Sequence, residues 1–261
     1  MPLTDFQASL ARLLSENRTP DSYLAGGAAI LIEPNTSRFS RDLDYFHDSE
    51  ARVSEAFEAD RGLLEVNGYE IDMDLSQPGY VRAIVRRNSH ATKVEWARDS
   101  AWRFVPTIRD DRVGYMLHPV DQAVNKVLAL AGRDEPRDVL DVLHFHRTLL
   151  VLGALCWAAC GKDPGFTPLS LLELLRRRGR VRPEDFARLD LVEPIDLRAL
   201  KTEWLEALDS VEPFVGSRPP DEIGCLYYSP SLQECVDPRN VDDAEPHFGR
   251  PGGVVPRLLE G

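Results

Sequence analysis

The sequence predicts an α+β fold, in which a small mixed sheet flanked by helices is followed by an α-helical C-terminal domain. Three strand-like runs follow one another in the first half of the chain: 69–75, 80–86 and 91–97. They come after a short run that carries Asp42 and Asp44, and short strands after an Asp-bearing strand indicate a mixed sheet with helices packed on it. Apolar residues at helical spacing over 169–178 and 183–210 predict an all-α second half.

Helix and turn signals surround these strands. Residues 4–16 place apolar side chains on one side of a helix, and residues 50–64 alternate charged and apolar residues at helical spacing. Between the first two strand-like runs, residues 76–79 (SQPG) hold proline and glycine in the order that a turn requires. Pro119 is placed at the first position of a further helix.

The charge balance of the chain is acidic. Its 261 residues include 31 Lys plus Arg against 43 Asp plus Glu, a net charge of −12. Such a balance disfavours indiscriminate binding to nucleic acid, which depends on a basic surface, but it leaves room for a local basic groove. The only dense basic run is 174–182 (LLRRRGRVR), which is the best candidate for a nucleic-acid contact.

Cysteines and apolar segments indicate the compartment. Cys156 and Cys160 lie four apart in an apolar run, and no CxxC pair or zinc-like spacing with histidine occurs, so we expect reduced thiols. The N-terminus has neither a basic start nor a long apolar stretch, unlike a signal peptide. The most apolar segment, 149–160, is too short to span a bilayer and predicts a buried helix. We expect a cytoplasmic protein without membrane contact.

Two short patterns between Tyr23 and Asp48 carry chemistry. Gly26 and Gly27 stand at a turn before a small-residue run, where bare backbone N–H groups allow a phosphate to approach. Asp42 and Asp44, two apart on a strand, point to the same face. Adjacent carboxylates repel each other, and a divalent cation bound through oxygen relieves the repulsion.

Together these patterns resemble the nucleotidyltransferase superfamily, and the longer string resembles the AbiEii/MenA-like branch, toxin components of bacterial toxin–antitoxin and phage-defence systems. That branch carries GGxA and then R-x-S-x-D-[LF]-D-[LFY]-F. The chain matches the second motif at each of its five invariant positions: Arg38, Ser40, Asp42, Asp44 and Phe46. The resemblance implies a nucleotidyltransferase-type sheet and a metal-dependent reaction on an NTP.

The resemblance also implies roles for these residues. Asp42 and Asp44 would hold Mg²⁺ or Mn²⁺. Backbone N–H groups of Gly26 and Gly27 would bind the nucleotide phosphates, and Arg38 would neutralise their charge. Ser40 would either hydrogen-bond a phosphate or cap the turn before the strand.

A third carboxylate is implied on a later strand. Glu95, flanked by apolar residues in 91–97, fits that place, and three carboxylates could hold two cations. The alternative is a surface glutamate that pairs with Lys93 on the same strand face. A second Asp pair, Asp72 and Asp74, has no glycines before it, and we expect it on the solvated face of an antiparallel edge strand.

The helix that begins at Pro119 carries Lys126 beside its apolar face. Spacing alone makes Lys126 a solvated charge, whereas the family pattern K-[VL]-x-A-L implies that its mobile ammonium reaches the triphosphate. Asp138 and Asp141 open the next helix and share one face. They could simply be acids stabilised by the helix dipole. The resemblance implies that one of them is catalytic or orients Lys126, and the sequence does not decide which.

The patterns divide the chain into a catalytic core (1–118), a helical domain that contributes to the site (119–215) and a Pro/Gly-rich C-terminal extension (216–261). We expect the end of this extension, residues 237–261, to be loosely ordered. The implied function is Mg²⁺-dependent transfer of NMP from an NTP to a hydroxyl acceptor, with pyrophosphate released. The resemblance suggests the tRNA 3′ end as acceptor and a cognate antitoxin protein as partner.

Two other acceptors are open, and there is one alternative without enzymatic activity. A small-molecule acceptor of the aminoglycoside type suits the acidic net charge, and a protein acceptor is known in some toxin–antitoxin pairs. A degenerate nucleotide-binding protein without activity is disfavoured because Asp42, Asp44 and Lys126 are all present.

Overall fold

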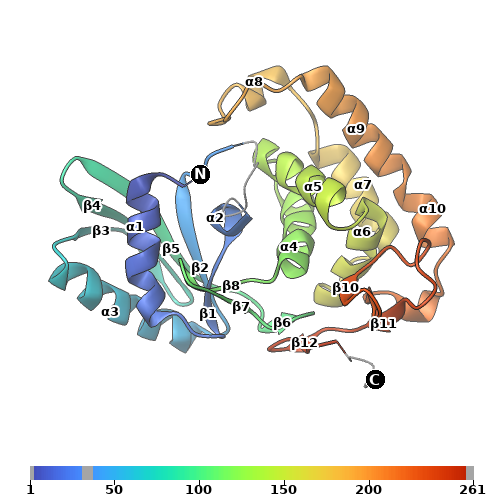
Figure 1. The fold of residues 1–261 in the computed structure, drawn as a ribbon. Helices are drawn as coiled ribbons and strands as arrows, with labels where there is room; N and C mark the ends of the chain where they lie inside the picture. Colours follow the sequence, from blue (N-terminus) through green and yellow to red (C-terminus); the bar gives the residue numbers. More distant parts are fainter. Residues whose placement is uncertain (1–2, 31–37, 257–261) are drawn as a thin grey trace. The chain divides into compact units, whose positions relative to one another are not determined.

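The computed structural model describes residues 3–30 and 38–256. The chain forms two compact units (Figure 1). The first unit consists of Met1–Trp102, Pro106–His118 and Pro251–Gly253, and the second of Arg103–Val105, Pro119–Arg250 and Val254–Gly261. The short strands β6 (Trp102–Arg103) and β12 (Arg250–Pro251) lie where the chain passes from one unit to the other.

The first unit is built on a seven-stranded mixed sheet with the strand order β3-β4-β5-β2-β1-β8-β7. Its strands are β1 (Ser22–Ala25), β2 (Asp42–His47), β3 (Glu70–Gln77), β4 (Tyr80–Arg87), β5 (His90–Arg98), β7 (Ile108–Asp110) and β8 (Gly114–Met116). The pairs β2–β5 and β1–β8 are parallel and the other pairs are antiparallel. The predicted mixed sheet is therefore confirmed. The three expected strand runs lie within β3, β4 and β5, apart from Tyr69, which precedes β3.

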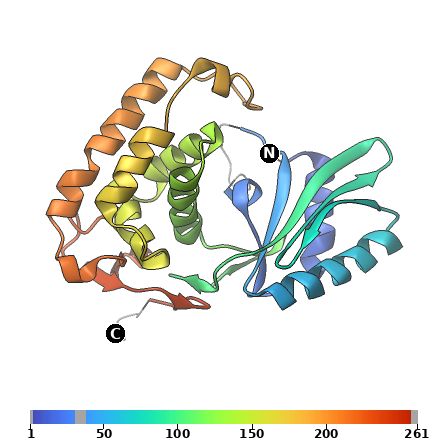
Figure 2. The same cartoon turned by 180° about the vertical axis from the view of Figure 1, so that it is seen from behind.

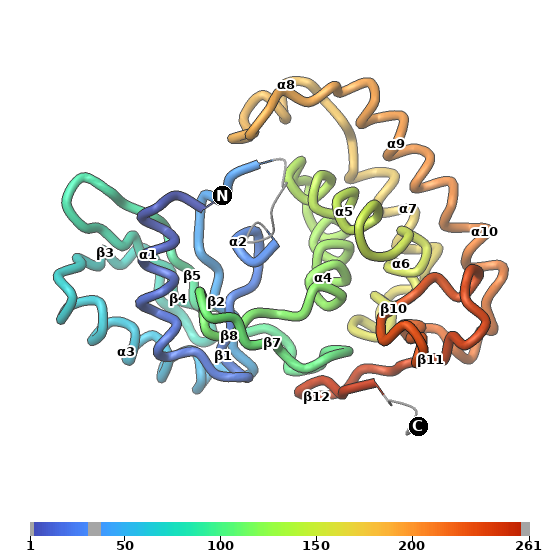
Figure 3. The backbone as a smooth tube through the Cα atoms, viewed as in Figure 1, coloured from blue at the N-terminus to red at the C-terminus, as the bar shows by residue number. Residues whose placement is uncertain are grey.

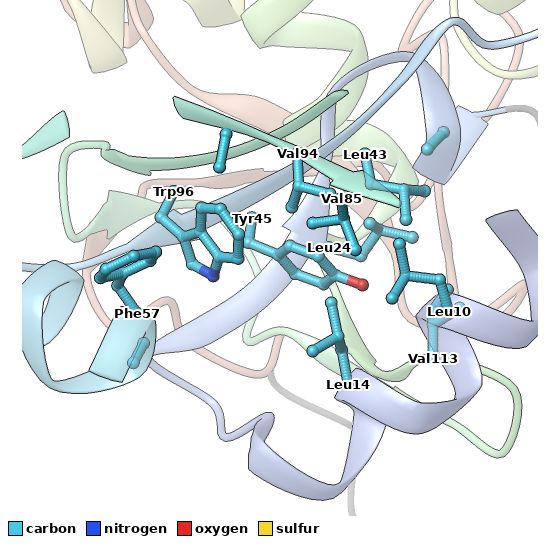
Figure 4. Packing of buried hydrophobic residues seen from close by; sticks show 14 of the residues in the cluster. Leu10, Leu14, Leu24, Leu43, Tyr45, Phe57, Val85, Val94, Trp96 and Val113 are labelled. Atoms are coloured by element: carbon cyan, nitrogen blue, oxygen red, sulfur yellow. The ribbon is translucent and has the colours of Figure 1, made fainter. Parts of the chain in front are cut away.

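One face of this sheet is covered by helices. The helices of the unit are α1 (Asp5–Leu14), which continues into a 3₁₀ turn (Ser15–Asn17), α2 (Gly26–Ile30) and α3 (Glu50–Val66). Leu10 and Leu14 of α1 and Phe57 of α3 pack in one cluster with alternate residues of the strands, such as Tyr45 and Trp96 (Figure 4). Figure 2 shows α3 beside the strands from behind. Because strand side chains alternate between faces, the residues between these apolar ones point to the opposite face.

The helix-covered face also buries an ion pair. The guanidinium of Arg18 lies 2.5 and 2.6 Å from the two carboxylate oxygens of Asp60, and both side chains are fully buried. Asp60 also accepts hydrogen bonds from Trp96 Nε1 (2.7 Å) and Asn17 Nδ2 (2.9 Å). Arg18 stacks on the Tyr45 ring, 4.4 Å from its centroid. This network joins the segment after α1, helix α3 and the sheet.

The second unit is mostly helical. Its α-helices are α4 (Pro119–Gly132), α5 (Pro136–Thr148), α6 (Leu152–Lys162), α7 (Pro168–Arg178), α8 (Pro183–Phe186), α9 (Leu197–Asp209) and α10 (Val211–Gly216), and a 3₁₀ turn spans Pro220–Glu222. The tube in Figure 3 can be followed from α4 through α5 to α6. The all-α second half is confirmed for residues 119–216, with one difference. The helix expected over 183–210 is two helices, α8 and α9, because residues 187–196 are not helical. This segment contains Pro194, which disfavours a helix, and Asp196, which caps the start of α9.

The region after α10 differs from the expected loose tail. Strands β10 (Glu234–Cys235), β9 (Leu226–Ser229) and β11 (Glu245–His247) form a small antiparallel sheet. His247 Nε2 lies 2.9 Å from the backbone oxygen of Phe104. The expectation of a loosely ordered segment from 237 onward is therefore wrong for residues 237–256. Pairing with the buried strand β9 orders β11, and composition alone did not indicate this pairing.

The apolar segment 149–160 forms most of α6, whose residues Leu152–Cys160 are buried within the second unit as expected. Among the described residues, no single helix has the length and apolarity needed to cross a bilayer. The bent pair of Pro136–Thr148 and Leu152–Lys162 meets those criteria only when its two helices are taken together.

Candidate active site

Three carboxylates gather on the face of the first unit's sheet that lies opposite the apolar core. Asp42 and Asp44 come from β2 and Glu95 from its parallel neighbour β5. The register places Asp44 opposite Glu95 and Asp42 opposite Lys93. One oxygen from each carboxylate can be chosen so that all three lie within 4.8 Å of one another. Asp42 is only 5% exposed, so the cluster is set into the unit and not spread over open surface.

This oxygen set suits a hard divalent cation. Mg²⁺ and Mn²⁺ prefer carboxylate oxygens, and a cation at the centre of three carboxylates offsets their mutual repulsion. In the structure a positively charged side chain already lies between two of these carboxylates. Lys93 Nζ lies 2.9 Å from Asp42 Oδ2 and 2.7 Å from Glu95 Oε1. Its ammonium group therefore supplies positive charge between two of the three carboxylates, as a metal ion would. The residues present therefore fit a divalent metal ion.

The glycine pair lies directly against this cluster. Gly26 has a positive φ of 62°, and a Cβ atom at this position would lie 1.9 Å from Asp44 Oδ2. At Gly27 a Cβ atom would lie 3.0 Å from Arg38 Nη2 and 3.4 Å from Ser40 Oγ. Any larger residue at Gly26 would displace the Asp44 carboxylate and strain the backbone. Because glycine has no side chain, the backbone at Gly26 can pass close to the Asp44 carboxylate.

Arg38 and Ser40 are both buried beside the glycines. Ser40 Oγ donates a hydrogen bond to the backbone oxygen of Asp42 (2.9 Å). The Ser40 backbone oxygen accepts one from Gln7 Nε2 (3.2 Å), which also donates to Thr92 Oγ1 (3.2 Å). In this structure Ser40 therefore holds the start of β2 in place. Gln7 was not predicted, and its position on an amphipathic helix gave no signal of this contact.

A second polar group lies in the second unit, around Lys126 of α4. Lys126 Nζ lies 3.0 Å from Asp138 Oδ1 and 2.7 Å from Asp141 Oδ2, both on α5. Lys126 is 7% exposed. The expectation from spacing alone, a solvated surface charge, is therefore wrong, because α5 packs against α4 and covers that side chain with two carboxylates.

Arg133 completes this group and was missed in the sequence. Its Nε and Nη2 lie 2.7 and 3.1 Å from the two oxygens of Asp138. Burial by itself would raise the pKa of the Asp138 carboxyl, but Lys126 and Arg133 outweigh it and leave that pKa below its usual range. Asp138 is thus held as a carboxylate that can hold an ammonium in place. The available signal for Arg133 was its spacing of seven residues from Lys126, about two helical turns, which places Arg133 directly after the end of α4 on the side of Lys126.

The predicted residues therefore fall into two groups, one in each unit. The first unit brings together Gly26, Gly27, Arg38, Ser40, Asp42, Asp44 and Glu95. The second brings together Lys126, Asp138 and Asp141.

Comparison with known proteins identifies the family of this chain. The family model described as nucleotidyl transferase AbiEii toxin, Type IV TA system, matches residues 9–237, which is most of the chain. The chain belongs to this family. It is a nucleotidyltransferase, and the resemblance seen in the motifs around Asp42 is confirmed. Membership of a Type IV toxin–antitoxin family implies an NTP substrate and an antitoxin partner for this AbiEii protein.

Two solved structures are similar to this AbiEii family member. MenT4, a nucleotidyltransferase toxin from Mycobacterium tuberculosis H37Rv, matches with a TM-score of 0.56 and 18% identity over 83% of this chain and 83% of that chain. JHP933 from Helicobacter pylori has a TM-score of 0.48 and 16% identity over 82% of this chain and 97% of that chain. The match to MenT4 confirms the α+β fold. No curated protein sequence matches the chain.

Proposed function

We propose that this AbiEii protein transfers NMP from an NTP to a hydroxyl acceptor in a Mg²⁺-dependent reaction that releases pyrophosphate. The observation that carries the proposal is the cluster of Asp42, Asp44 and Glu95, whose oxygens lie within 4.8 Å of one another on adjacent parallel strands. These three residues would hold the metal. When bound, a divalent cation neutralises phosphate charge and makes a nearby hydroxyl a better nucleophile.

The groups around the cluster would bind the nucleotide. Gly26 and Gly27 carry no side chain of their own, and their backbone passes close to Asp44 and Arg38. This supports contact of their N–H groups with phosphate oxygens bound at the cluster. The buried guanidinium of Arg38 would offset phosphate charge. Ser40 would hold the start of the strand that carries both aspartates.

Lys126 would bind the triphosphate, with Asp138 and Asp141 as its positioning residues. Both carboxylates lie within 3.0 Å of its ammonium, which supports a role for both of them. An ammonium on a flexible stem can turn from these carboxylates to a phosphate without losing all of its partners. Asp138 and Asp141 then act on the nucleotide through Lys126.

Replacing Lys126 by alanine is expected to weaken NTP binding by roughly 1.5–3 kcal/mol, the usual range for a hydrogen bond to a charged group. The measurement is calorimetric titration of each NTP into the full chain. Lys201→Ala, which removes an exposed lysine of α9, is the control. Equal dissociation constants for wild type and Lys126→Ala would return Lys126 to a purely structural role with Asp138 and Asp141.

For the acceptor we propose the 3′ end of tRNA, supported by a group of exposed arginines on an otherwise acidic protein. Arg177, Arg178 and Arg180 at the end of α7 are exposed, and in the part of the chain that the structure describes they form no ion pair. Their neighbours are engaged: Arg176 lies 3.1 Å from Glu212 and Arg182 lies 4.0 Å from Asp185. These exposed arginines support binding of RNA phosphates at the end of α7.

Changing Arg177, Arg178 and Arg180 to alanine together is expected to weaken tRNA binding. The plot of log affinity against log salt should also become less steep, by roughly 0.7–0.9 for each phosphate that the protein no longer neutralises. NTP binding should not change. A matched triple variant removes three exposed arginines of the first unit: Arg12, Arg61 and Arg87. Equal reductions in tRNA affinity for the two triple variants would mean that only net charge matters and that the end of α7 is no binding site.

The acceptor class is tested by incubating the protein with Mg²⁺ and each labelled NTP, together with total tRNA, an aminoglycoside or a candidate antitoxin. Label on tRNA supports the proposal. Label on the aminoglycoside or on the protein would keep the nucleotidyltransferase activity and replace the acceptor.

A further inference from the structure

Lys93 lies within the acidic cluster, and the family resemblance gives it no role. It lies on β5 two residues before Glu95 and opposite Asp42 in the parallel register. Its ammonium contacts Asp42 Oδ2 at 2.9 Å and Glu95 Oε1 at 2.7 Å, and thus joins two strands through their carboxylates. The Lys93 side chain is 33% exposed, whereas the side chains of Asp42 and Glu95 are 7% and 19% exposed.

We propose that Lys93 occupies the cation position of this cluster in the free protein, and that a divalent cation binds there only by displacing it. Lys93 then sets the metal affinity of the enzyme. This inference rests on the proposed function in one respect, the assignment of Asp42, Asp44 and Glu95 as the metal ligands.

Geometry makes the two cations competitors. A magnesium ion lies about 2.0–2.1 Å from each oxygen ligand. If it used Asp42 Oδ2 while Lys93 stayed 2.9 Å from the same atom, the two cations would be at most about 5 Å apart. A unit and a double positive charge at that separation, in a partly buried site, repel strongly. The ammonium and the metal also compete for the same two carboxylates, because Lys93 already contacts one oxygen of Asp42 and one of Glu95.

The ammonium is able to leave. It is carried by a flexible four-carbon stem, and a third of the side chain already meets solvent. A purely structural counter-ion would give a different result, since its removal would loosen the cluster and would not improve the binding of a metal. The two roles predict opposite changes in metal affinity.

The test is a titration of the full chain with Mn²⁺ alone, without nucleotide, with free Mn²⁺ followed by electron paramagnetic resonance. Lys93→Met is expected to bind one Mn²⁺ at least tenfold more tightly than wild type, a change of about 1.4 kcal/mol. Lys93→Arg keeps the positive charge and should bind Mn²⁺ as weakly as wild type. Lys201→Met is the matched control, because it makes the same substitution at an exposed lysine of α9. Adding Asp44→Asn to Lys93→Met should abolish the tight site, which places it at the cluster.

Lys93→Gln provides a second neutral variant that can still hydrogen-bond to Asp42 and Glu95, should Lys93→Met fail to fold by circular dichroism. Unchanged or weaker Mn²⁺ binding in the folded neutral variant would overturn the proposal, as would tightening that survives Asp44→Asn. Metal-dependent NMP transfer by the wild type alongside such a result would leave the proposed function standing and remove only the role of Lys93.

Discussion

Replacing Asp44 by asparagine is expected to lower NMP transfer by roughly 10³-fold, the scale on which removal of one preorganised electrostatic group acts. Asparagine keeps the shape of the side chain, so the close approach to Gly26 is unchanged. It removes one of the three negative charges that would hold the metal. The measurement is the initial rate of label transfer at saturating NTP and Mg²⁺, with circular dichroism to show that the fold is intact.

The chain offers a matched control for this variant. Asp72 belongs to a second Asp-x-Asp pair on β3, at the edge of the same sheet, where its side chain is 70% exposed and lies 3.8 Å from Arg86. As the sequence predicted, this pair is solvated on an antiparallel edge strand. Asp72→Asn should therefore keep the wild-type rate. Comparable rates for Asp44→Asn and Asp72→Asn would contradict the assignment of the metal site.

Replacing Asp60 by alanine is expected to lower the free energy of unfolding by about 3–5 kcal/mol, the cost of breaking a buried ion pair by removing one partner. The variant leaves the fully buried guanidinium of Arg18 without its carboxylate and removes the acceptor of Trp96 Nε1. Urea unfolding followed by circular dichroism measures this decrease.

Glu58 is the control for Asp60, because it lies two residues earlier on α3 and its ion pair with Arg61 is exposed on both sides. Surface pairs of this kind contribute about 0–1 kcal/mol, so Glu58→Ala should change the unfolding free energy little. A decrease below about 1 kcal/mol for Asp60→Ala would show that the Arg18–Asp60 pair offsets no more than its own desolvation.

Local signals account for what could be predicted from the sequence. Alternation over a few residues located β4 and β5, and the two-residue spacing of Asp42 and Asp44 predicted that they share one face of β2. The glycine pair predicted a turn before a small-residue helical run, and the structure places Gly26 at a positive φ of 62° at the start of α2. Each of these features depends on residues near one another in the chain, so that strand geometry and glycine sterics are enough.

Features that depend on distant residues could not be read in this way. Lys126 has the spacing of a surface lysine, and only the packing of α5 on α4 buries it between Asp138 and Asp141. Arg18 and Asp60 are 42 residues apart and form their pair only when α3 packs on the sheet. Strand β11 likewise exists because β9 pairs with it. In each case tertiary contacts override what the local pattern favours.

Nucleotidyl transfer itself is tested most directly by two labels on one nucleotide. The full chain is incubated with Mg²⁺, the acceptor found in the screen and an NTP that carries ³²P on either the α- or the γ-phosphate. We expect the α-label to become attached to the acceptor and the γ-label to appear as pyrophosphate in equal amount, with neither event in EDTA. Attachment of the γ-label to the acceptor would make the protein a kinase and would contradict metal-dependent nucleotidyl transfer, as would undiminished transfer of the α-label in EDTA.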